Sequence, residues 1–217
     1  MDELWAGGPC YKHRIGLFPL SSDTAWLGGF LRLGGVRTAI DLGCGGGALS
    51  LQILGRKPSV CLTAVDILSA AAEQTAQNAA RNGFSVQTVT GNLADYKTLL
   101  PRERFDLAAS NPPYYPLSHP AAEGERGGAR RESCTLSEWV CAAAWTLRFG
   151  GHFCLVYLPE RLSELLCTMT EAGIEPKRLR MIHKDEHTAP SAVLVDGCKG
   201  GKIGLSIEPP LFAGQKG

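Results

Sequence analysis

Short apolar runs alternate along the chain with longer segments in which apolar residues recur at every third or fourth position. Short runs bounded by Gly, Pro, Asn or Asp are typical of buried strands, whereas the wider spacing is typical of amphipathic helices. The pattern predicts helices over 22–32, 47–55, 67–82, 135–148 and 159–172. It predicts strands over 36–41, 60–66, 84–90, 105–110, 152–158, 176–183 and 191–197.

This alternation predicts an α/β fold with an open, mostly parallel sheet of seven strands and helices on both faces. The last two predicted strands are too close in sequence for a crossover helix, so we expect an antiparallel hairpin at one edge. A chain of 217 residues is the size of one compact domain. We expect that domain to span 35–217, after an N-terminal segment and helix over 1–34.

Polar residues lie at or just beyond the ends of four predicted strands. They are Asp41, Asp66, Asn92 and Asn111. Ligands of open parallel sheets bind beyond the carboxyl ends of the strands. One crevice can therefore collect all four side chains.

A glycine-rich turn, Gly43-Cys44-Gly45-Gly46-Gly47, connects the first of these strands to the next helix. Glycines at such a turn let the backbone bend tightly and let a ligand approach it closely. A carboxylate after the second strand, here Asp66, is placed to accept hydrogen bonds from ribose hydroxyls. A nicotinamide dinucleotide site would more often have the full G-x-G-x-x-G spacing, which is absent here. The spacing therefore favours S-adenosylmethionine.

The segment Asn111-Pro112-Pro113-Tyr114-Tyr115 follows another buried strand. Its two prolines fix the backbone and remove two N–H groups, so carbonyls there can act as uncommitted acceptors. The Asn111 amide supplies a further acceptor, and Tyr114 offers a flat face for stacking. The pattern indicates a site for a planar amino group that donates two hydrogen bonds. A tight turn with a packed tyrosine is the alternative interpretation.

These two motifs together resemble the class I S-adenosylmethionine-dependent methyltransferases that carry an N-P-P-Y motif. Nearly the whole chain is similar to the bacterial tRNA1(Val) adenine-N6 methyltransferase family. Outside the two motifs, the segments that resemble this family are 23–27, 177–183, 192–197 and 209–211.

The resemblance implies a class I (Rossmann-like) fold, S-adenosylmethionine as cofactor with S-adenosylhomocysteine as product, and the N6 amino group of an adenosine in a tRNA anticodon loop as target. The N-terminal segment would pack over the cofactor site. Residues expected to bind the cofactor are Asp23, Asp41, Gly43, Gly45, Gly47, Asp66, Ile67, Asn92, Leu93 and Asn111. Residues expected to act in catalysis are Asn111, Pro112, Pro113 and Tyr114, and those expected to contact the substrate are Tyr114, Tyr115, Arg130 and Arg131.

Three alternatives stay open. A protein glutamine N5-methyltransferase would present an amide NH2 to the same motif, although such enzymes usually carry an N-terminal helical substrate domain. A DNA or rRNA amino-methyltransferase would use the same chemistry, although no separate target-recognition domain is visible for DNA. A non-catalytic S-adenosylmethionine-binding scaffold would have no need for Asn111 and Tyr114.

The segment 116–133 is rich in Pro, Gly and Arg and directly follows the motif, so we expect a lid over the target pocket. Its arginines, with Lys177, Arg178, Arg180 and Lys184 further on, would contact RNA phosphates. The net charge of the chain is only +1, so RNA binding would depend on a local patch.

Composition bears on membrane association, secretion, disulfides and metal binding. No apolar run approaches the roughly 20 residues that span a bilayer, and the first residues lack the basic start and apolar core of a signal peptide. We therefore expect a cytoplasmic protein with no membrane partner. The eight cysteines form no Cys-x-x-Cys pair and are interpreted as small buried thiols. His183 and His187 are expected at the surface, no metal is predicted, and the oligomeric state is left open.

Overall fold

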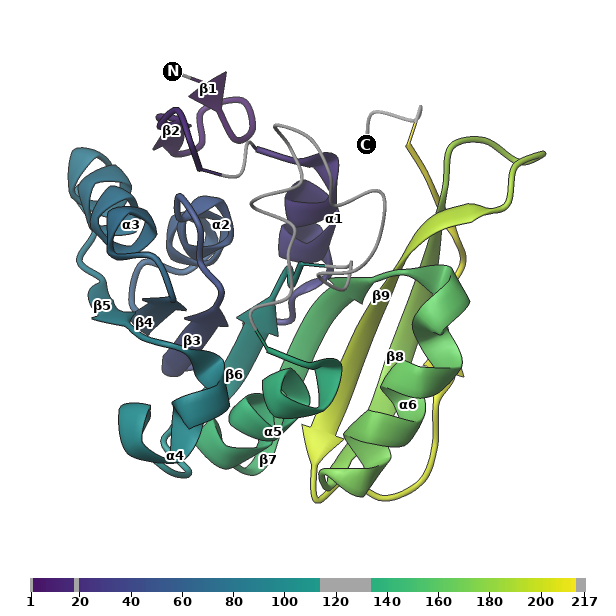
Figure 1. Cartoon of the computed structure of the whole chain (residues 1–217). Coiled ribbons are helices and arrows are strands. Elements are labelled where there is room, and N and C mark those ends of the chain that lie inside the picture. The colour runs from purple at the N-terminus through teal and green to yellow at the C-terminus, as the bar shows by residue number, and fades with distance from the viewer. Residues whose placement is uncertain (1, 18–19, 114–133, 214–217) are drawn as a thin grey trace.

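A central sheet runs through the molecule in the computed structural model, which describes residues 2–17, 20–113 and 134–213 (Figure 1). Within these residues the sheet has nine strands along the path β10-β8-β9-β7-β6-β3-β4-β5, with β11 also paired to β8. The long strands are β3 (Thr38–Leu42), β4 (Cys61–Asp66), β5 (Gln87–Thr90), β6 (Phe105–Ser110), β7 (Leu147–Tyr157), β8 (Ile174–His183) and β9 (Pro190–Lys199). Tyr114, Tyr115, Arg130, Arg131 and the lid expected over 116–133 lie outside the described residues.

The strand pairing confirms the predicted α/β class. The five strands from β5 to β7 pair in parallel, whereas β9 is antiparallel to both β7 and β8. Two strands of two residues each, β10 (Ser206–Ile207) and β11 (Leu211–Phe212), were not predicted. Both pair in parallel with β8, so the predicted hairpin is covered on its outer side.

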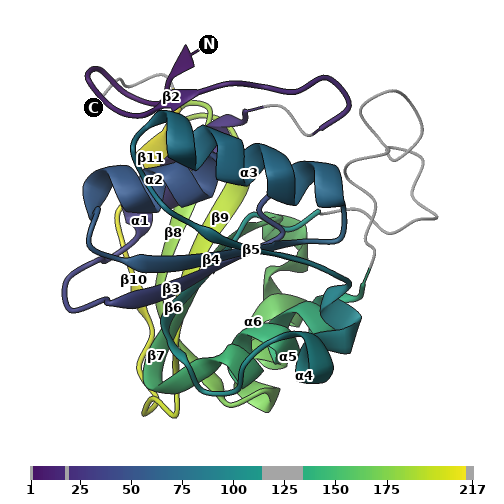
Figure 2. The ribbon, with the colours of Figure 1, turned by 90° about the vertical axis from the view of Figure 1, so that its left-hand side faces the viewer.

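Helices cover both faces of the sheet, as predicted (Figure 2). On one face lie α1 (Ser22–Phe30), α2 (Ala48–Arg56) and α3 (Ser69–Arg81); on the other lie α4 (Tyr96–Leu99), α5 (Leu136–Thr146) and α6 (Leu162–Glu171). Large side chains of the central strands, such as Ile40, Leu107 and Phe153, are almost completely buried between these layers. None of the helices in the described part of the chain is long and apolar enough to cross a membrane.

The boundary between α5 and β7 differs from the prediction. The helix predicted over 135–148 ends at Thr146, and the strand begins at once at Leu147. The glycines that were expected to end the helix instead lie in an irregularity of the strand, where Phe105 pairs with Leu147 but Leu107 pairs with His152. Gly150 has a φ of +77° there, a conformation that favours glycine. The glycines therefore permit a bulge inside a strand.

An N-terminal segment that includes β1 (Asp2–Glu3) and β2 (Cys10–Tyr11) is fastened to α3 by carboxamide side chains. Asn82 Oδ1 accepts from Cys10 N and Asn82 Nδ2 donates to Cys10 O, both at 2.8 Å. Asn78 makes the same pair of bonds with the backbone of Lys12, at 3.2 and 3.1 Å, and Gln74 Nε2 also donates to Lys12 O. Because residues four apart lie on one helix face, these amides form a row that pairs with extended backbone as a neighbouring strand would.

The basic residues expected to face RNA on β8 are mostly engaged elsewhere, so that prediction was wrong for Arg178. Its guanidinium is buried, bonds to Asp196 Oδ2 at 2.8 Å and to Glu208 Oε1 at 3.1 Å, and donates to Phe30 O at 3.0 Å. It also stacks 4.0 Å from the centre of the Phe30 ring. Arg180 is less buried and pairs with Glu208 at 2.7 Å. The Arg178 cluster ties α1, β8, β9 and the C-terminal segment together.

The cysteines are free thiols, and their burial differs from one to the next. Cys44, Cys134 and Cys154 are buried, as expected of small thiols in a core. Cys61 and Cys167 are exposed, which contradicts the burial expected for Cys61 in the second strand. Cys61 is the first residue of β4, where the strand enters the sheet from the surface.

Replacing Arg178 by Met should destabilise the fold strongly, because the Asp196 carboxylate would stay buried with only His152 as an ionisable partner. We expect a loss of about 3–5 kcal/mol in the free energy of unfolding. Arg180→Met is the matched control: its pair with Glu208 is more exposed, and we expect a loss below about 1 kcal/mol. Urea unfolding of the three proteins measures both losses, and equal losses would contradict the assignment.

Candidate active site at the strand ends

The parallel pairing brings the predicted polar residues to one edge of the sheet. Asp41 of β3 is in register with Ala64 of β4, and Asp66 at the end of β4 is in register with Thr90 of β5. Asn92 follows β5 and Asn111 follows β6, which pairs with β3. Four strands therefore deliver their polar ends to the same side, where open parallel sheets bind ligands.

The glycine-rich turn between β3 and α2 requires glycine at several positions. Gly43, Gly45 and Gly47 have φ values of +73°, +54° and +86°, which side chains rarely adopt. Close neighbours also exclude side chains: a Cβ on Gly43 would lie 2.8 Å from the Trp139 ring. A Cβ on Gly46 would lie 2.2 Å from the Tyr11 hydroxyl. Gly45 differs from these two, because nothing lies within 4 Å of the position of its missing Cβ, so a ligand can approach the backbone closely there.

Side chains of α3 hold the carbonyl groups of this turn. Thr75 Oγ1 donates to Gly45 O at 3.0 Å, and Asn78 Nδ2 donates to Gly46 O at 2.8 Å. On the opposite side, Gly45 N donates to Asp66 Oδ2 at 2.9 Å. The carbonyls consequently point at α3, and one N–H points at the carboxylate of the neighbouring strand. This role of Asn78 was not predicted from the sequence; the available signal is the spacing of four between Gln74, Asn78 and Asn82, which places three amides on one helical face.

Asp41 is almost fully buried below the turn, and its Oδ2 accepts from Ser50 Oγ at 2.6 Å. Burial raises the pKa of Asp41 to about 7, and the nearby Asp66 charge acts in the same direction, partly offset by the Ser50 hydrogen bond. Burial also raises the pKa of Asp66, although Gly45 N and Leu68 N donate to that carboxylate. A cationic ligand bound nearby would lower the pKa of both carboxyls and favour their ionised forms.

Residues beyond β4 and β5 surround the Asp66 carboxyl. The Ile67 side chain is 45% exposed, an apolar surface next to the carboxyl that suits a flat ring. Asn92 Oδ1 accepts from Ala94 N at 3.0 Å and so caps the 3-10 helix η1 (Leu93–Asp95). The Leu93 side chain is buried in the core, so a ligand at this position would meet backbone and the edge of the Asn92 amide.

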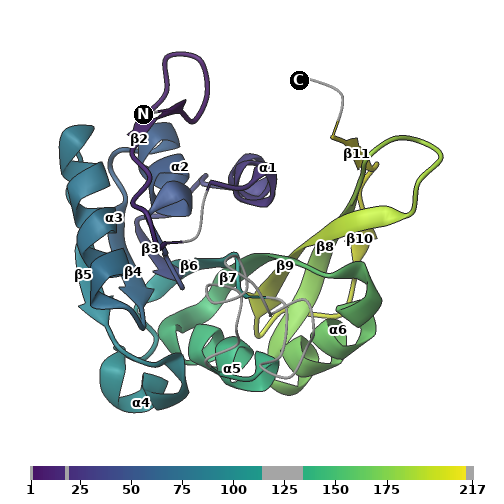
Figure 3. The same cartoon turned by 45° about the horizontal axis from the view of Figure 1, so that its top comes forward.

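Asn111 lies against the beginning of α1. Its Nδ2 donates to Thr24 Oγ1 at 3.0 Å and to Ser21 Oγ at 3.4 Å, and Asp23 lies in the same first turn of α1. The helix itself packs beside α2 and against β7 and β9 (Figure 3). The predicted division of the chain at residue 34 stays a prediction.

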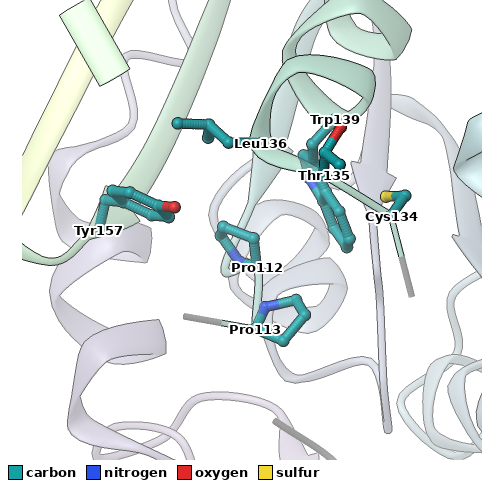
Figure 4. A pocket seen from close by; sticks show the side chains of 7 residues that line it. All are labelled: Pro112, Pro113, Cys134, Thr135, Leu136, Trp139 and Tyr157. Carbon is teal, nitrogen blue, oxygen red and sulfur yellow. The ribbon is translucent and has the colours of Figure 1, made fainter. Parts of the chain in front are cut away.

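Pro112 and Pro113 form part of the wall of a small, mainly apolar pocket (Figure 4). The other residues of its wall are Cys134, Thr135, Leu136, Trp139 and Tyr157. Trp139 Nε1 donates to Ser110 Oγ at 2.8 Å, and Ser110 Oγ donates to Leu42 O at 2.7 Å. This chain of hydrogen bonds fixes the pocket wall to the ends of β6 and β3. Proline and aromatic faces of this kind suit a planar group.

Among the described residues, no group of three His, Cys, Asp or Glu side chains is arranged to hold a metal ion. His183 Nδ1 is within 2.8 Å of Thr188 O in its own hairpin, and His187 is exposed. Of the predicted site residues, those of the strand ends and of the glycine turn come together, while Tyr114, Tyr115, Arg130 and Arg131 lie outside the described residues.

Solved structures of methyltransferases have the same fold. A predicted O-methyltransferase from Agrobacterium tumefaciens matches with a TM-score of 0.66 at 20% identity, over 83% of this chain and 82% of that one. A methyltransferase from Pyrococcus furiosus matches with a TM-score of 0.63 at 19% identity, over 88% of both chains. The fold and the strand-end site therefore define the class I methyltransferase architecture.

Sequence comparison defines the family. The methyltransferase small domain family matches residues 30–166. Two relatives are named tRNA1(Val) (adenine(37)-N6)-methyltransferase. The protein from Escherichia coli O157:H7 is 30% identical over 181 residues, which is 81% of this chain and 73% of that protein. The protein from Citrobacter koseri is 35% identical over 146 residues, which is 65% of this chain and 59% of that protein. The chain belongs to the methyltransferase small domain family, in the group that includes these relatives.

The chain spans only part of some of these relatives. The Porphyromonas gingivalis protein of the same name is 30% identical over 160 residues, which is 71% of this chain and 63% of that protein. The predicted resemblance is thereby confirmed at the level of the family.

The buried carboxyl of Asp41 predicts a specific pH dependence. An unfolded Asp titrates at about 3.9, whereas the pKa of Asp41 in the fold is about 7. Between these values the folded protein keeps a proton that the unfolded chain has released, so Asp41 lowers the free energy of unfolding as pH rises through this range. Asp41→Asn keeps an acceptor for Ser50 and removes the titration.

Urea unfolding of wild type and Asp41→Asn, at about pH 5 and about pH 7.5, measures this effect. We expect the variant to gain stability relative to wild type as the pH is raised. A difference between the two proteins that does not change with pH would contradict a raised pKa.

Proposed function

We propose that this chain is an S-adenosylmethionine-dependent methyltransferase that methylates the N6 amino group of an adenosine in tRNA. The observation that carries the proposal is the position of Asn111 next to the glycine turn. The two are joined by the hydrogen bond from Ser110 Oγ to Leu42 O, because Ser110 precedes Asn111 and Leu42 precedes Gly43. The glycine turn, which would bind the cofactor, and the Asn111 motif, which would accept from an amino group, therefore lie side by side.

The residues of the turn fit S-adenosylmethionine, which supplies an activated methyl group on a positively charged sulfur. The backbone of Gly43, Gly45 and Gly47 would pass close to its methionyl part, with open space at Gly45, and Asp41 lies below with a pKa that a cation would lower. Asp66 would accept from the ribose hydroxyls, exchanging its present bond from Gly45 N. Ile67 would pack against the adenine ring.

Asn111 and Pro112 would hold the target amine. The Asn111 Oδ1 and the Pro112 carbonyl would accept hydrogen bonds from its two N–H groups, which would direct the nitrogen lone pair at the methyl group. Nitrogen gains the methyl, the sulfur keeps the electron pair of the broken bond as S-adenosylhomocysteine forms, and the extra proton leaves to solvent. No nucleophilic side chain is needed, because orientation and the two acceptors favour the transition state.

The choice of tRNA rests on the names of the relatives, each called a tRNA1(Val) (adenine(37)-N6)-methyltransferase. An anticodon-loop adenosine is part of this proposal, as is the cytoplasmic location that a tRNA substrate entails. Direct transfer would proceed in the same way on a glutamine side chain, a DNA base or an rRNA base, so the experiment below includes those substrates.

Transfer of a labelled methyl group from S-adenosylmethionine tests the substrate. Unmodified total tRNA, rRNA, duplex DNA and a translation-factor protein are offered separately, and the labelled product is identified by mass spectrometry. We expect label in N6-methyladenosine of tRNA alone. Label in protein glutamine or in another nucleic acid would keep the chemistry and refute the substrate, whereas tight cofactor binding without any transfer would favour a scaffold.

Replacing Asn111 by Ala tests the motif. Loss of an acceptor aimed at the reacting group should lower kcat on the order of 100-fold or more. The Kd for S-adenosylmethionine, measured by calorimetry, should change little, because the turn and Asp66 stay intact. A variant that binds the cofactor poorly but turns over normally at saturation would contradict the catalytic assignment.

A further inference from the structure

One side chain of α5, Trp139, contacts both the glycine turn and the segment that carries Asn111. The far edge of its indole ring lies against Gly43, since a Cβ on that glycine would be 2.8 Å from Cζ2 and 2.9 Å from Cη2. Its Nε1 donates to Ser110 Oγ at 2.8 Å, and Ser110 directly precedes Asn111. Trp139 also lines the pocket of Figure 4 together with Pro112. It therefore lies between the two halves of the candidate site.

The direction of each hydrogen bond around Ser110 is fixed by the chemistry of its partners. An indole N–H can only donate, and a backbone carbonyl can only accept. Ser110 Oγ therefore accepts from Trp139 and donates its single hydrogen to Leu42 O, at 2.7 Å. All three residues are buried, so solvent does not compete for these groups. The hydroxyl thus has one arrangement, in which it joins α5 to the end of β3.

These side-chain bonds begin where the backbone pairing of β3 with β6 ends. The last paired residues of the two strands are Asp41 and Ala109. Leu42 and Ser110 come next in the chain, and the Ser110 hydroxyl joins them. Beyond that point the two strands lead into separate loops. Trp139 touches both loops just past the last backbone pair, so its ring fills the space between them.

The start of α5 holds Trp139 in place. Thr135 and Glu138 form a capping box, in which Glu138 N donates to Thr135 Oγ1 at 3.2 Å and Thr135 N donates to Glu138 Oε2 at 2.7 Å. Trp139 N donates to Thr135 O at 3.0 Å, so the indole projects from a capped first turn. A side chain that departs from a fixed helix end can act as a rigid spacer.

We propose that Trp139 is a positioning residue that sets the distance between the glycine turn and the Asn111 motif. This inference rests on the function proposed above, in which the turn holds the methyl donor and the motif holds the target amine. Reacting atoms have to lie about 3–3.5 Å apart, and a displacement of about 1 Å can lower the rate about 100-fold. Loss of the spacer should therefore lower kcat more than it weakens cofactor binding.

The kinetic test compares Trp139→Phe and Ser110→Ala with Trp145→Phe. For the first two variants we expect kcat to fall roughly tenfold, the effect of a displacement smaller than 1 Å. The Kd for S-adenosylmethionine, measured by calorimetry, should change less than about threefold. Trp145→Phe is the matched control, because Trp145 lies on the same helix and its Nε1 also donates to a carbonyl, Leu100 O, at 3.0 Å. Its kcat should stay at the wild-type value.

A double-mutant cycle tests whether Trp139 acts through Ser110. In a Ser110→Ala background the ring has lost its anchor, so Trp139→Phe should lower kcat by a smaller factor than it does in wild type. Equal factors in both backgrounds would refute the connection. A Kd for the cofactor raised about tenfold with kcat unchanged would also refute the proposal, since Trp139 would then support only the cofactor turn.

A measurement without a methyl acceptor separates this inference from the function on which it rests. The chain has four tryptophans, and the indole N–H signal of Trp139 is identified in nitrogen-15 NMR by its loss in Trp139→Phe. We expect slow exchange of this proton with water, and a shifted signal with faster exchange in Ser110→Ala. Addition of S-adenosylhomocysteine should shift the signal of Trp139 and leave that of Trp145 in place.

The two kinds of failure are then distinguishable. A Trp139 signal that responds to neither Ser110→Ala nor S-adenosylhomocysteine would overturn the positioning role, even if tRNA methylation is demonstrated. A signal that responds to both, in a protein that transfers label to another amino-group substrate, would refute only the choice of tRNA, and the kinetic comparison would be made on that substrate.

Discussion

The parallel pairing of β3 with β4 on one side and β6 on the other is the constraint on which the site depends. Parallel strands end at the same edge, so the residues at or just beyond the ends of β3, β4 and β6 must meet in space, although Gly43 and Asn111 are 68 positions apart. The glycine turn, Asp66 and Asn111 occupy those three positions. Most residues of β3, β4 and β6 are buried, and the polar residues of the candidate site lie at or near the ends of these strands. The candidate site is thereby confined to one rim of this part of the sheet.

Each loop of this rim is held by a different helix. The carbonyls of the glycine turn are bound by α3 through Thr75 and Asn78, the Ser110 hydroxyl by α5 through Trp139, and the Asn111 amide by the start of α1. Polar groups buried at these junctions need partners, since an unpaired one costs about 1–3 kcal/mol. Satisfying them also fixes the loops in place, so the same hydrogen bonds that stabilise the fold define the geometry of the site.

Periodicity and motif spacing were enough to predict the mostly parallel sheet, the antiparallel hairpin and the strand ends at which the candidate site residues meet. They failed where partners distant in sequence decide the outcome. Arg178 resembles a surface residue in a basic run, but Asp196 and Glu208, 18 and 30 positions away, draw it into the interior. Gln74, Asn78 and Asn82 resemble an exposed polar helix face in the sequence, and only the N-terminal segment packed against them explains their burial. Gly150 and Gly151, after α5, are compatible in sequence with either the end of a helix or a bulge in a strand. Only the pairing of β7 with β6 distinguishes the two cases.

The row of amides on α3 has a consequence for synthesis of the chain on the ribosome. Cys10 and Lys12 emerge before their partners, because Asn82 and Asn78 are 72 and 66 positions further on. The N-terminal segment therefore cannot make these hydrogen bonds until α3 has been synthesised. Asn78 bonds to both this segment and the glycine turn. The glycine turn likewise gains its hydrogen bond from Asn78 only after α3 has been synthesised, so one side chain fixes two segments that were made before it.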